Sequence, residues 1–370
     1  MKDMQQSASG RADVIEIIYA PLVGGSETLA FDLCKRWHAR GIRVRICCLY
    51  EREGPLTQLF EREGIAYDLL DIGAKGLLGR WFTIGRYLHK HRPLAIHVHH
   101  FGLLINVFVP AYLMGSTNIV FTEHSTYVMA QRGWMRRAIR FVVRFVNQMT
   151  CVSSSILEYF NRLGIPEDKM AVVYNGVDTT RFHPPTRPHS NAIEVRVVAV
   201  GRMVEEKDYP TLLEALAILK ALGYRFRAQI VGDGPLAGEL ARQHERLGLA
   251  SHVQLLGRRA EIPEILRRSD IYVLSSKSEG MPIALLEAMA TGLAIAATNV
   301  AAVPEVIVDN VNGLLVPKGN EHALAEAIAR LIDDPMLRRR LGTRAIEDAR
   351  TLFSIENATA LYSYYLDIAS

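Results

Sequence analysis

The sequence predicts an α/β protein made of two doubly wound parallel-sheet domains that face a central cleft. Short β-branched runs alternate with helical patterns along the chain, which is typical of βαβ units. The alternation breaks once, at the proline-rich run HPPTRPHSNA (183–192), and then starts afresh. A chain of 370 residues, 49% hydrophobic and 22% charged, is long enough to bury two such cores.

The first domain, residues 1–185, is expected to contain seven strands with helical stretches between them. The strands are VIEIIYA (14–20), IRVRICCLY (42–50), IAYDLL (65–70), PLAIHVHH (93–100), TNIVFT (117–122), QMTCVS (148–153) and KMAVVYN (169–175).

The second domain, residues 186–352, repeats the scheme. Its strands are EVRVVAV, RAQIVG, HVQLLG, IYVLSS, LAIAAT and NGLLVP, and several end in glycine or small-residue turns. Ligands bind outside the carboxyl ends of parallel strands, where glycine permits close approach. Residues 353–370 form an amphipathic helix that we expect to pack back toward the first domain.

No membrane-spanning segment is predicted. The uncharged run 101–122 is long enough, but Pro110 and the turn at 115–118 divide it into a helix and a strand. The amino-terminal residues lack the apolar stretch of a signal peptide, and the four cysteines have no metal-ligand spacing. We therefore expect a cytoplasmic protein with reduced thiols.

Charge is unevenly divided between the two halves. Up to residue 185 the chain has 22 Lys+Arg against 16 Asp+Glu, and beyond it 21 against 23. The basic first half favours an anionic partner, such as a membrane surface or a phosphate-bearing acceptor. We expect no nucleic-acid partner.

The stretch GRMVEEKD (201–208) follows a strand directly. Arg202 and Lys207 leave the carboxyl end of that strand within one short loop, where a guanidinium and an ammonium together suit a diphosphate. Two solvated surface charges are the alternative.

The stretch SSKSEGMPIALLEAMATG (275–292) predicts an anion site at a helix start. Pro282 suits a first helical residue, so the helix is expected to begin near Met281, with free N–H groups from Gly280 onward. Glu279 and Glu287 can accept hydrogen bonds from hydroxyls at the two ends of a ligand. A ligand with an anionic middle and hydroxylated ends is a sugar nucleotide; a surface helix with solvated glutamates is the alternative.

These motifs together resemble the retaining glycosyltransferases of the GT-B fold, specifically family 4, glycosyl transferases group 1. The similarity covers nearly the whole chain, with matches in the expected order. They are PLVGGSETLAFDLCKRWHARGIRVRI, HVHH, TEHST, YNGVD, GRMVEEKD, VGDGP, LGRR and EGMPIALLE.

The resemblance implies two Rossmann-like domains and a hexosyl transfer from a UDP- or GDP-sugar with retained configuration. Arg202 and Lys207 would neutralise the departing diphosphate, Glu279 would bind sugar hydroxyls, and His124 would lie beside the reacting sugar. Further donor-binding positions implied by the motifs are Gly24, Gly25, Asn175, Gly201, Gly232, Arg258, Gly280, Met281, Pro282, Ile283 and Glu287.

The resemblance also implies that the leaving phosphate oxygen accepts the acceptor's proton, so that no protein nucleophile is needed. We expect no cofactor and no metal, since the chain has no Asp-x-Asp for a metal-held diphosphate. The expected acceptor is a glycan or a lipid-linked saccharide in cell-surface polysaccharide synthesis. The sequence leaves the donor nucleotide, the sugar and the acceptor open.

Two positions depart from the family pattern. Asp208 replaces the usual glycine after the diphosphate lysine, where it can cap the next helix but adds a negative charge near phosphates. Ala301 and Ala302 replace a glycine pair, and their methyl groups would narrow the donor site if they point inward.

The histidines and one basic helix give two weaker predictions. His97, His99, His100 and His124 end strands and could face the cleft, although a packed core position is favoured for His97 and a zinc site is not expected. The helix 133–148 has an arginine stripe that could lie on an anionic bilayer at the inner face of the cytoplasmic membrane; a helix with solvated arginines is equally compatible.

Two other functions remain open. A nicotinamide-dependent oxidoreductase would need G-x-G-x-x-G after a strand, and the nearest candidate, GDGPLAG, places its third glycine one position late. A non-catalytic binding member of the family is opposed by the intact Arg202, Lys207, Glu279 and His124.

Overall fold

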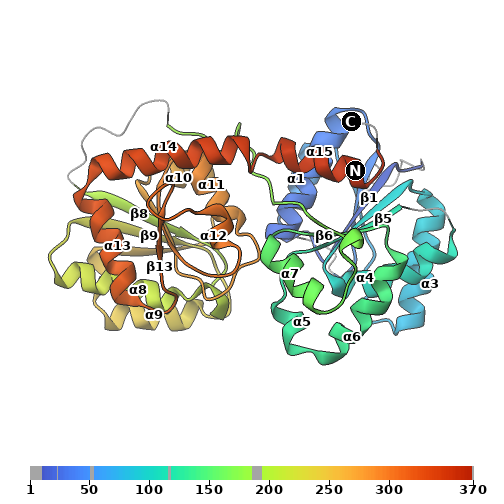
Figure 1. Ribbon diagram of the computed structural model, residues 1–370, viewed down its shortest axis with the longest axis horizontal. Helices are drawn as coiled ribbons and strands as arrows, with labels where there is room; N and C mark the ends of the chain where they lie inside the picture. Colours follow the sequence, from blue (N-terminus) through green and yellow to red (C-terminus); the bar gives the residue numbers. More distant parts are fainter. Residues whose placement is uncertain (1–10, 23, 51–53, 116–117, 186–193, 369–370) are drawn as a thin grey trace. The chain divides into compact units, whose positions relative to one another are not determined.

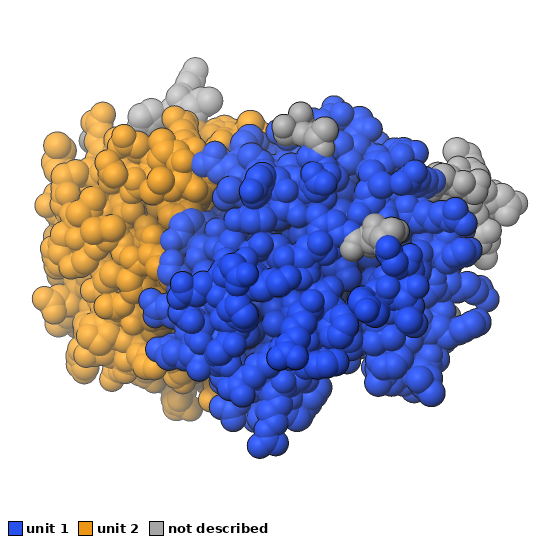
Figure 2. Space-filling model, turned by 45° about the vertical axis from the view of Figure 1, so that its right-hand side comes forward, with its two compact units in different colours: residues 1–176, 355–370 blue, residues 177–354 orange. Residues whose placement is uncertain are grey.

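The computed structural model describes residues 11–22, 24–50, 54–115, 118–185 and 194–368. The chain forms two compact units, coloured separately in Figure 2. Unit 1 comprises Met1–Gly176 and Ile355–Ser370, and unit 2 comprises Val177–Ser354.

Unit 1 contains a seven-stranded parallel sheet in the order β3-β2-β1-β4-β5-β6-β7. All residues of β1, β2 and β4 are buried, as expected for a parallel sheet with helices on both faces. The strands are β1 (Val14–Ile18), β2 (Val44–Cys48), β3 (Ala66–Leu69), β4 (Ala95–His99), β5 (Asn118–Glu123), β6 (Gln148–Cys151) and β7 (Met170–Val172). All seven predicted strands are confirmed.

The helices of unit 1 alternate with these strands, and α15 packs against α1 (Figure 1). They are α1 (Gly25–Ala39), α2 (Thr57–Arg62), α3 (Leu77–His91), α4 (Phe101–Leu113), α5 (Tyr127–Gln131), α6 (Gly133–Val142), α7 (Ser154–Arg162) and α15 (Ile355–Tyr365), with 3-10 turns η1 (Val143–Phe145) and η2 (Glu167–Lys169).

The predicted division of the run 101–122 into a helix and a strand is confirmed by α4 and β5, whereas the predicted helix 133–148 needs correction. Pro110 lies inside α4, which continues to Leu113 and ends before the left-handed Gly115 (φ 74°). The predicted helix 133–148 is α6 only to Val142, because a 3-10 turn follows and β6 begins at Gln148. None of the helices in the described part of the chain combines the length and the apolar character that crossing a bilayer needs.

Unit 2 contains a six-stranded parallel sheet in the order β10-β9-β8-β11-β12-β13. Its core joins the inner faces of the strands to α8 and α13, which pack against each other (Figure 1). The strands are β8 (Val195–Val200), β9 (Phe226–Val231), β10 (Val253–Gly257), β11 (Ile271–Leu274), β12 (Ala294–Thr298) and β13 (Leu314–Val316). All six predicted strands are confirmed.

The helices of unit 2 cover its sheet, and α11 packs against α14. They are α8 (Tyr209–Ala221), α9 (Ala237–Arg246), α10 (Ile262–Arg267), α11 (Ile283–Thr291), α12 (Val303–Val306), α13 (Glu321–Asp333) and α14 (Pro335–Thr351), with 3-10 turns η3 (Glu205–Lys207) and η4 (Leu249–Ser251).

The boundary between the units lies at Gly176–Val177, nine residues before the break drawn from the prolines. Val177 N donates to Phe353 O (2.8 Å), so the start and the end of unit 2 pair with each other. Residues beyond Val177 already belong to unit 2, because Arg267 Nη1 donates to Arg181 O (3.2 Å). Most of the proline-rich run, from residue 186, lies outside the described residues.

The carboxyl-terminal helix α15 belongs to unit 1, and side-chain hydrogen bonds attach it there. Trp37 Nε1 of α1 donates to Ser363 Oγ (2.9 Å), and Asn118 Nδ2 of β5 donates to Tyr365 O (2.8 Å). The cleft expected between the two domains stays a prediction.

Candidate active site

The strand order of unit 2 reverses between β8 and β11, and ligands of open α/β sheets bind outside the carboxyl ends of the strands at such a point. The loop after β8 is 201–208, which contains Arg202 and Lys207. The loop after β11 is 275–282, which contains Glu279. The structure therefore brings the two motifs that the sequence singled out to one edge of one sheet.

A direct ion pair joins these loops. Lys207 Nζ donates to Glu279 Oε1 (2.5 Å), and the two side chains are 23% and 8% exposed. Ser276 Oγ donates to the same carboxylate oxygen (2.6 Å). Glu279 thus has a fixed cation and a fixed hydroxyl, which leaves Oε2 for a further donor.

Backbone contacts hold the loops in register. Ser275 Oγ donates to Lys207 O (2.9 Å), and Lys277 N donates to Glu206 O (2.8 Å). Lys207 therefore reaches Glu279 from a braced backbone, which lowers the entropy lost when a ligand orders the site.

Asp208, the first departure from the family pattern, is not a helix cap in the expected sense. It occupies the N-cap position of α8 in a left-handed conformation (φ 47°), but its carboxylate accepts no backbone N–H. Thr211 Oγ1 donates to Asp208 Oδ2 (2.8 Å) and Lys277 Nζ pairs with Oδ1 (3.2 Å). Because Lys277 pairs with this carboxylate, the net repulsion toward a nearby anion is reduced.

Glycines let the strand ends approach each other closely. Gly232, after β9, has φ 145°, and a Cβ there would come within 1.8 Å of Gly201 O. At Gly201 a Cβ would meet Tyr209 Oη at 3.0 Å and Lys207 Cε at 3.5 Å. Arg202 and Arg258, at the ends of β8 and β10, are exposed.

Helix α11 begins at Ile283, with Pro282 as its N-cap residue, so the predicted start near Met281 is two residues early. Met281 and Pro282 are buried, and Gly280 is half-buried. Glu287 lies on the second turn of the helix and is half-buried. The first N–H groups of this nine-residue helix follow Glu279 within four residues, so an anion there would lie next to the Lys207–Glu279 pair.

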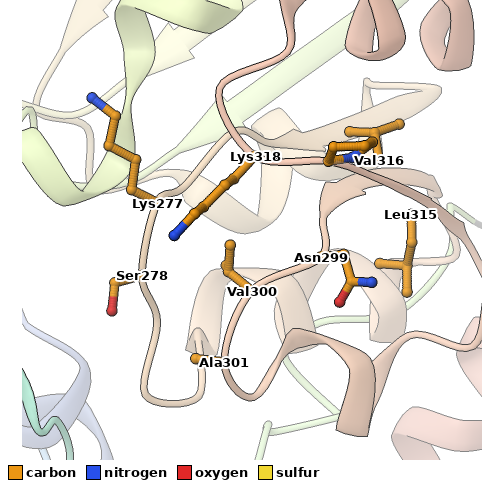
Figure 3. A pocket seen from close by; sticks show the side chains of 9 residues that line it. Lys277, Ser278, Asn299, Val300, Ala301, Leu315, Val316 and Lys318 are labelled. Atoms are coloured by element: carbon orange, nitrogen blue, oxygen red, sulfur yellow. The ribbon is translucent and has the colours of Figure 1, made fainter.

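A pocket of about 810 Å³ borders this loop within unit 2 (Figure 3). Lys277 and Ser278 form one side, Asn299–Ala301 another, and Leu315–Lys318 a third. Ala301 lines the pocket with φ 42°, a conformation that glycine adopts more easily, whereas Ala302 is fully buried. Of the two alanines, only Ala301 narrows the pocket.

The strand order of unit 1 reverses between β1 and β4. Gly24 and Gly25 form the amino end of α1 after β1, and a Cβ at Gly24 would lie 2.4 Å from Glu27 Oε2. His100 follows β4, and its Nε2 lies 2.9 Å from Ser26 Oγ in the first turn of α1. Asn175, in the loop after β7, is buried.

Glu123 organises this edge. Its Oε1 accepts the backbone N–H of His124 (3.0 Å) and lies 3.2 Å from His100 Nδ1, and its Oε2 accepts Phe101 N–H (3.1 Å). Burial lowers the pKa of His100, but hydrogen bonding and attraction to Glu123 raise it further, so it lies above its usual value. Sequence reasoning missed Glu123, although it precedes His124 in the quoted TEHST motif.

The four histidines do not share one environment. His97 and His99 are fully buried, whereas His100 and His124 are partly accessible. The packed core position favoured for His97 is confirmed, whereas the expectation that His99 could face a cleft is wrong, because residues inside β4 are covered on both faces of the sheet.

Both buried histidines contact a carboxylate that the sequence reading did not single out. Glu16 Oε1 lies 2.8 Å from His97 Nδ1, and Glu16 Oε2 lies 2.6 Å from His99 Nε2. An acidic residue inside the apolar run VIEII was the signal available in the sequence.

The Glu16, His97 and His99 ligand atoms lie within 4.8 Å of one another, as they would around a metal ion. Their hydrogen-bond distances account for the arrangement without an ion, since each carboxylate oxygen has one imidazole partner. His97 Nε2 also has a partner, Thr122 Oγ1 at 2.6 Å. We therefore assign a hydrogen-bond network here.

Two family models match the two halves of this chain. The family model "Glycosyltransferase Family 4" matches residues 23–181, and "Glycosyl transferases group 1" matches residues 188–348. The putative colanic acid biosynthesis glycosyltransferase WcaL of Escherichia coli is 34% identical over 177 residues, 45% of this chain and 43% of that protein.

Other relatives are similar over nearly the full length. The N-acetyl-alpha-D-glucosaminyl L-malate synthase of Bacillus anthracis is 26% identical, covering 96% of this chain and 97% of its own. The crystal structure of HepE from Anabaena, in complex with UDP and glucose, has a TM-score of 0.85 at 21% identity, covering 96% of this chain and 100% of that chain.

For three curated relatives the aligned segments span only 43%, 56% and 43% of the relative's length. The similarity to solved structures confirms the fold class expected from the sequence, two parallel-sheet α/β domains of the GT-B type.

Proposed function

The chain belongs to the group 1 glycosyltransferases of family 4, and from this premise we propose that it transfers a sugar from a nucleoside diphosphate sugar to an acceptor hydroxyl with retained configuration. The observation that carries the proposal is the Lys207–Glu279 pair at the reversal point of the unit 2 sheet, close before the amino end of α11.

The proposed roles follow from the chemistry of these groups. An ammonium has three N–H donors, so Lys207 can keep its bond to Glu279 and direct two donors at the diphosphate. Arg202 and the first N–H groups of α11 add positive charge around the same anion. Glu279 Oε2 accepts a sugar hydroxyl, and Glu287 accepts a ribose hydroxyl one helical turn or more away.

Electrostatic stabilisation of the leaving diphosphate is the largest contribution that these residues can make. The departing phosphate oxygen takes the proton of the acceptor hydroxyl on the same face, so the C–O bond to phosphate breaks as the new C–O bond forms. Side chains and a helix end neutralise the diphosphate in this scheme, in place of the metal ion that an Asp-x-Asp motif would hold.

Donor binding is tested by thermal unfolding of the full chain with UDP-, GDP- and ADP-sugars. We expect one nucleotide class to raise the melting temperature, because a ligand at a hundred times its Kd stabilises the native state by about 2.7 kcal/mol. The free nucleoside is the control, since it lacks the diphosphate. No shift with any of the three classes would contradict the proposal.

We further propose a glycan or a lipid-linked saccharide as the acceptor, in polysaccharide or glycoconjugate synthesis. Names of relatives support this, among them the colanic acid glycosyltransferase WcaL and a galactosyltransferase whose name specifies a diphosphoundecaprenol-linked GlcNAc. An acceptor on a lipid would place the reaction at a membrane surface.

The surface of α6 and η1 supports contact with an anionic bilayer. Arg136, Arg140 and Arg144 are exposed there, together with Trp134 and Phe141, each 55% exposed. Buried Met135 and Ile139 attach the same helix to unit 1. Arginines next to exposed aromatic rings are typical of surfaces that lie in a lipid interface.

Replacing Arg136, Arg140 and Arg144 by glutamate is expected to abolish flotation with vesicles containing anionic lipid at low salt. The matched control replaces three exposed arginines of unit 2, Arg246, Arg339 and Arg350, by glutamate, which gives the same change in net charge. If both triple variants lose flotation equally, or the unaltered chain never floats, the membrane proposal is wrong.

A further inference from the structure

A carboxylate lies in the middle of the unit 1 sheet, where the proposed chemistry does not require one. Glu16 is the third of the five residues of β1, and its side chain is 0% exposed. The register of β1 and β4 pairs Glu16 with His97, and His99 points to the same face two residues later. Burying a carboxylate is costly unless its oxygens are hydrogen-bonded, and both imidazoles meet that need.

The protonation of this group follows from its surroundings. Burial raises the pKa of Glu16, but His97 and His99 lower it by more, so Glu16 is ionised. Burial lowers the pKa of His99 to about 4, so its ring is neutral and has one N–H. That proton belongs on Nε2, which faces Glu16 Oε2 at 2.6 Å.

The neutral ring of His99 determines the next contact. With Nε2 protonated, His99 Nδ1 is an acceptor, and it lies 2.8 Å from His124 Nε2. His124 must therefore donate from Nε2. His124 Nδ1 has no hydrogen-bond partner in the part of the chain that the structure describes, and it is not among the enclosed atoms.

Other ionisable groups around His124 favour the same neutral state. Burial and then the neighbouring His100, His99 and His97 rings hold the pKa of His124 well below its usual value. The His100 ring centroid lies 4.9 Å from that of His124, and His100 is paired with Glu123. When His100 is protonated, a second positive charge on His124 beside it is disfavoured.

We propose that Glu16 and His99 are positioning residues that hold His124 as the Nε2–H tautomer and present its Nδ1 as a hydrogen-bond acceptor to a hydroxyl of the bound sugar. The identity of the ligand rests on the proposed function, whereas the tautomer depends on this chain alone. A hydroxyl that donates to Nδ1 keeps its oxygen lone pairs for other donors, so the contact selects sugars with a hydroxyl at that place.

The tautomer can be measured without a ligand by NMR of the full chain labelled with ¹⁵N-histidine, because protonated and unprotonated ring nitrogens resonate far apart. His124→Gln identifies the signals. We expect a single Nε2–H tautomer for His124 at neutral pH, whereas a free imidazole exchanges between both. A Nδ1–H tautomer or an exchanging mixture would overturn the proposal.

Two variants separate positioning from packing. His99→Phe and His97→Phe each keep a buried ring and each remove one Glu16 bond, so a purely structural role predicts similar spectra for both. We expect His124 to exchange between tautomers in His99→Phe only. Equal effects of the two changes would contradict the assignment. If either variant does not fold, the spectrum of the unaltered chain still shows which tautomer His124 adopts.

Ligand binding then connects the tautomer to the site. Whichever of the UDP-, GDP- and ADP-sugars stabilises the chain is expected to bind about tenfold more weakly to His99→Phe than to His97→Phe, as the loss of one hydrogen bond implies. If no nucleotide sugar binds any form, the proposed function fails while the NMR result stands. If added zinc shifts the ¹⁵N signals of His97 and His99, the two histidines that contact Glu16, they form a metal site, and the assigned hydrogen-bond network is wrong.

Discussion

Sugar transfer is expected to fall at least about a hundredfold when Lys207 is replaced by alanine, since removing one preorganised donor to a developing anion has effects of that size. Lys207 is the only described cation that contacts Glu279, so the change removes positive charge from the diphosphate and frees the glutamate from its partner. Initial rates with the stabilising donor, or its slow hydrolysis when no acceptor is known, measure the loss.

The same substitution leaves Glu279 with the hydrogen bond from Ser276 Oγ. Its side chain is 8% exposed, so the melting temperature is expected to fall modestly while the fold is retained. Lys35→Ala provides the control, because it breaks another lysine–glutamate pair, with Glu63, on the surface of unit 1. A near-normal rate in a folded Lys207→Ala protein would remove the assigned role.

The strands could be predicted because they are short apolar runs rich in β-branched residues, several of which end at glycine or a small residue. The strand order reverses between β8 and β11 and between β1 and β4. The motifs singled out from the sequence follow these same strands, so they lie at the two reversal points. Lys207 and Glu279 are 72 positions apart, and their meeting follows from β8 and β11 being neighbours.

Contacts that depend on register could not be predicted in this way. Glu16 and His99 are 83 positions apart, and only the pairing of β1 with β4 places them on one face. The sequence identified His124 through its motif, whereas the acid inside the apolar run VIEII was a weak signal for Glu16, since one acid in an apolar strand has many explanations.

Local signals also failed where tertiary contacts override them. Proline marked a boundary at 183–192, whereas the two compact units divide at Gly176–Val177, where Val177 pairs with Phe353. The spacing of the arginines predicted a helix that continues past Val142. In the structure α6 ends at Val142, and the chain passes through a 3-10 turn into β6, which begins at Gln148.

Gly232→Ala is expected to have the largest effect on stability in unit 2. The residue has φ 145°, which L side chains rarely adopt, and its added Cβ would overlap Gly201 O at 1.8 Å. The new Cβ is bonded to the backbone and Gly201 O is a backbone atom, so no side-chain rotation can relieve the overlap. The end of β9 and the loop 201–208 must therefore move apart. Strain of about 1–3 kcal/mol from the backbone alone is a minimum, and the overlap adds to it.

Gly223→Ala provides the matched control for this prediction, because Gly223 also has a positive φ (81°) but an added Cβ meets nothing within 4 Å. Urea unfolding should show a loss of about 1 kcal/mol for Gly223→Ala and more than about 3 kcal/mol for Gly232→Ala. Gly201 lies close to Lys207, since a Cβ at Gly201 would be 3.5 Å from Lys207 Cε. A displacement of Gly201 should therefore also move Lys207. The donor-induced rise in melting temperature should then disappear in Gly232→Ala but not in Gly223→Ala. Equal stabilities of the two variants would show that the strand ends do not need this close approach, and the packing assigned to the diphosphate loop would then be wrong.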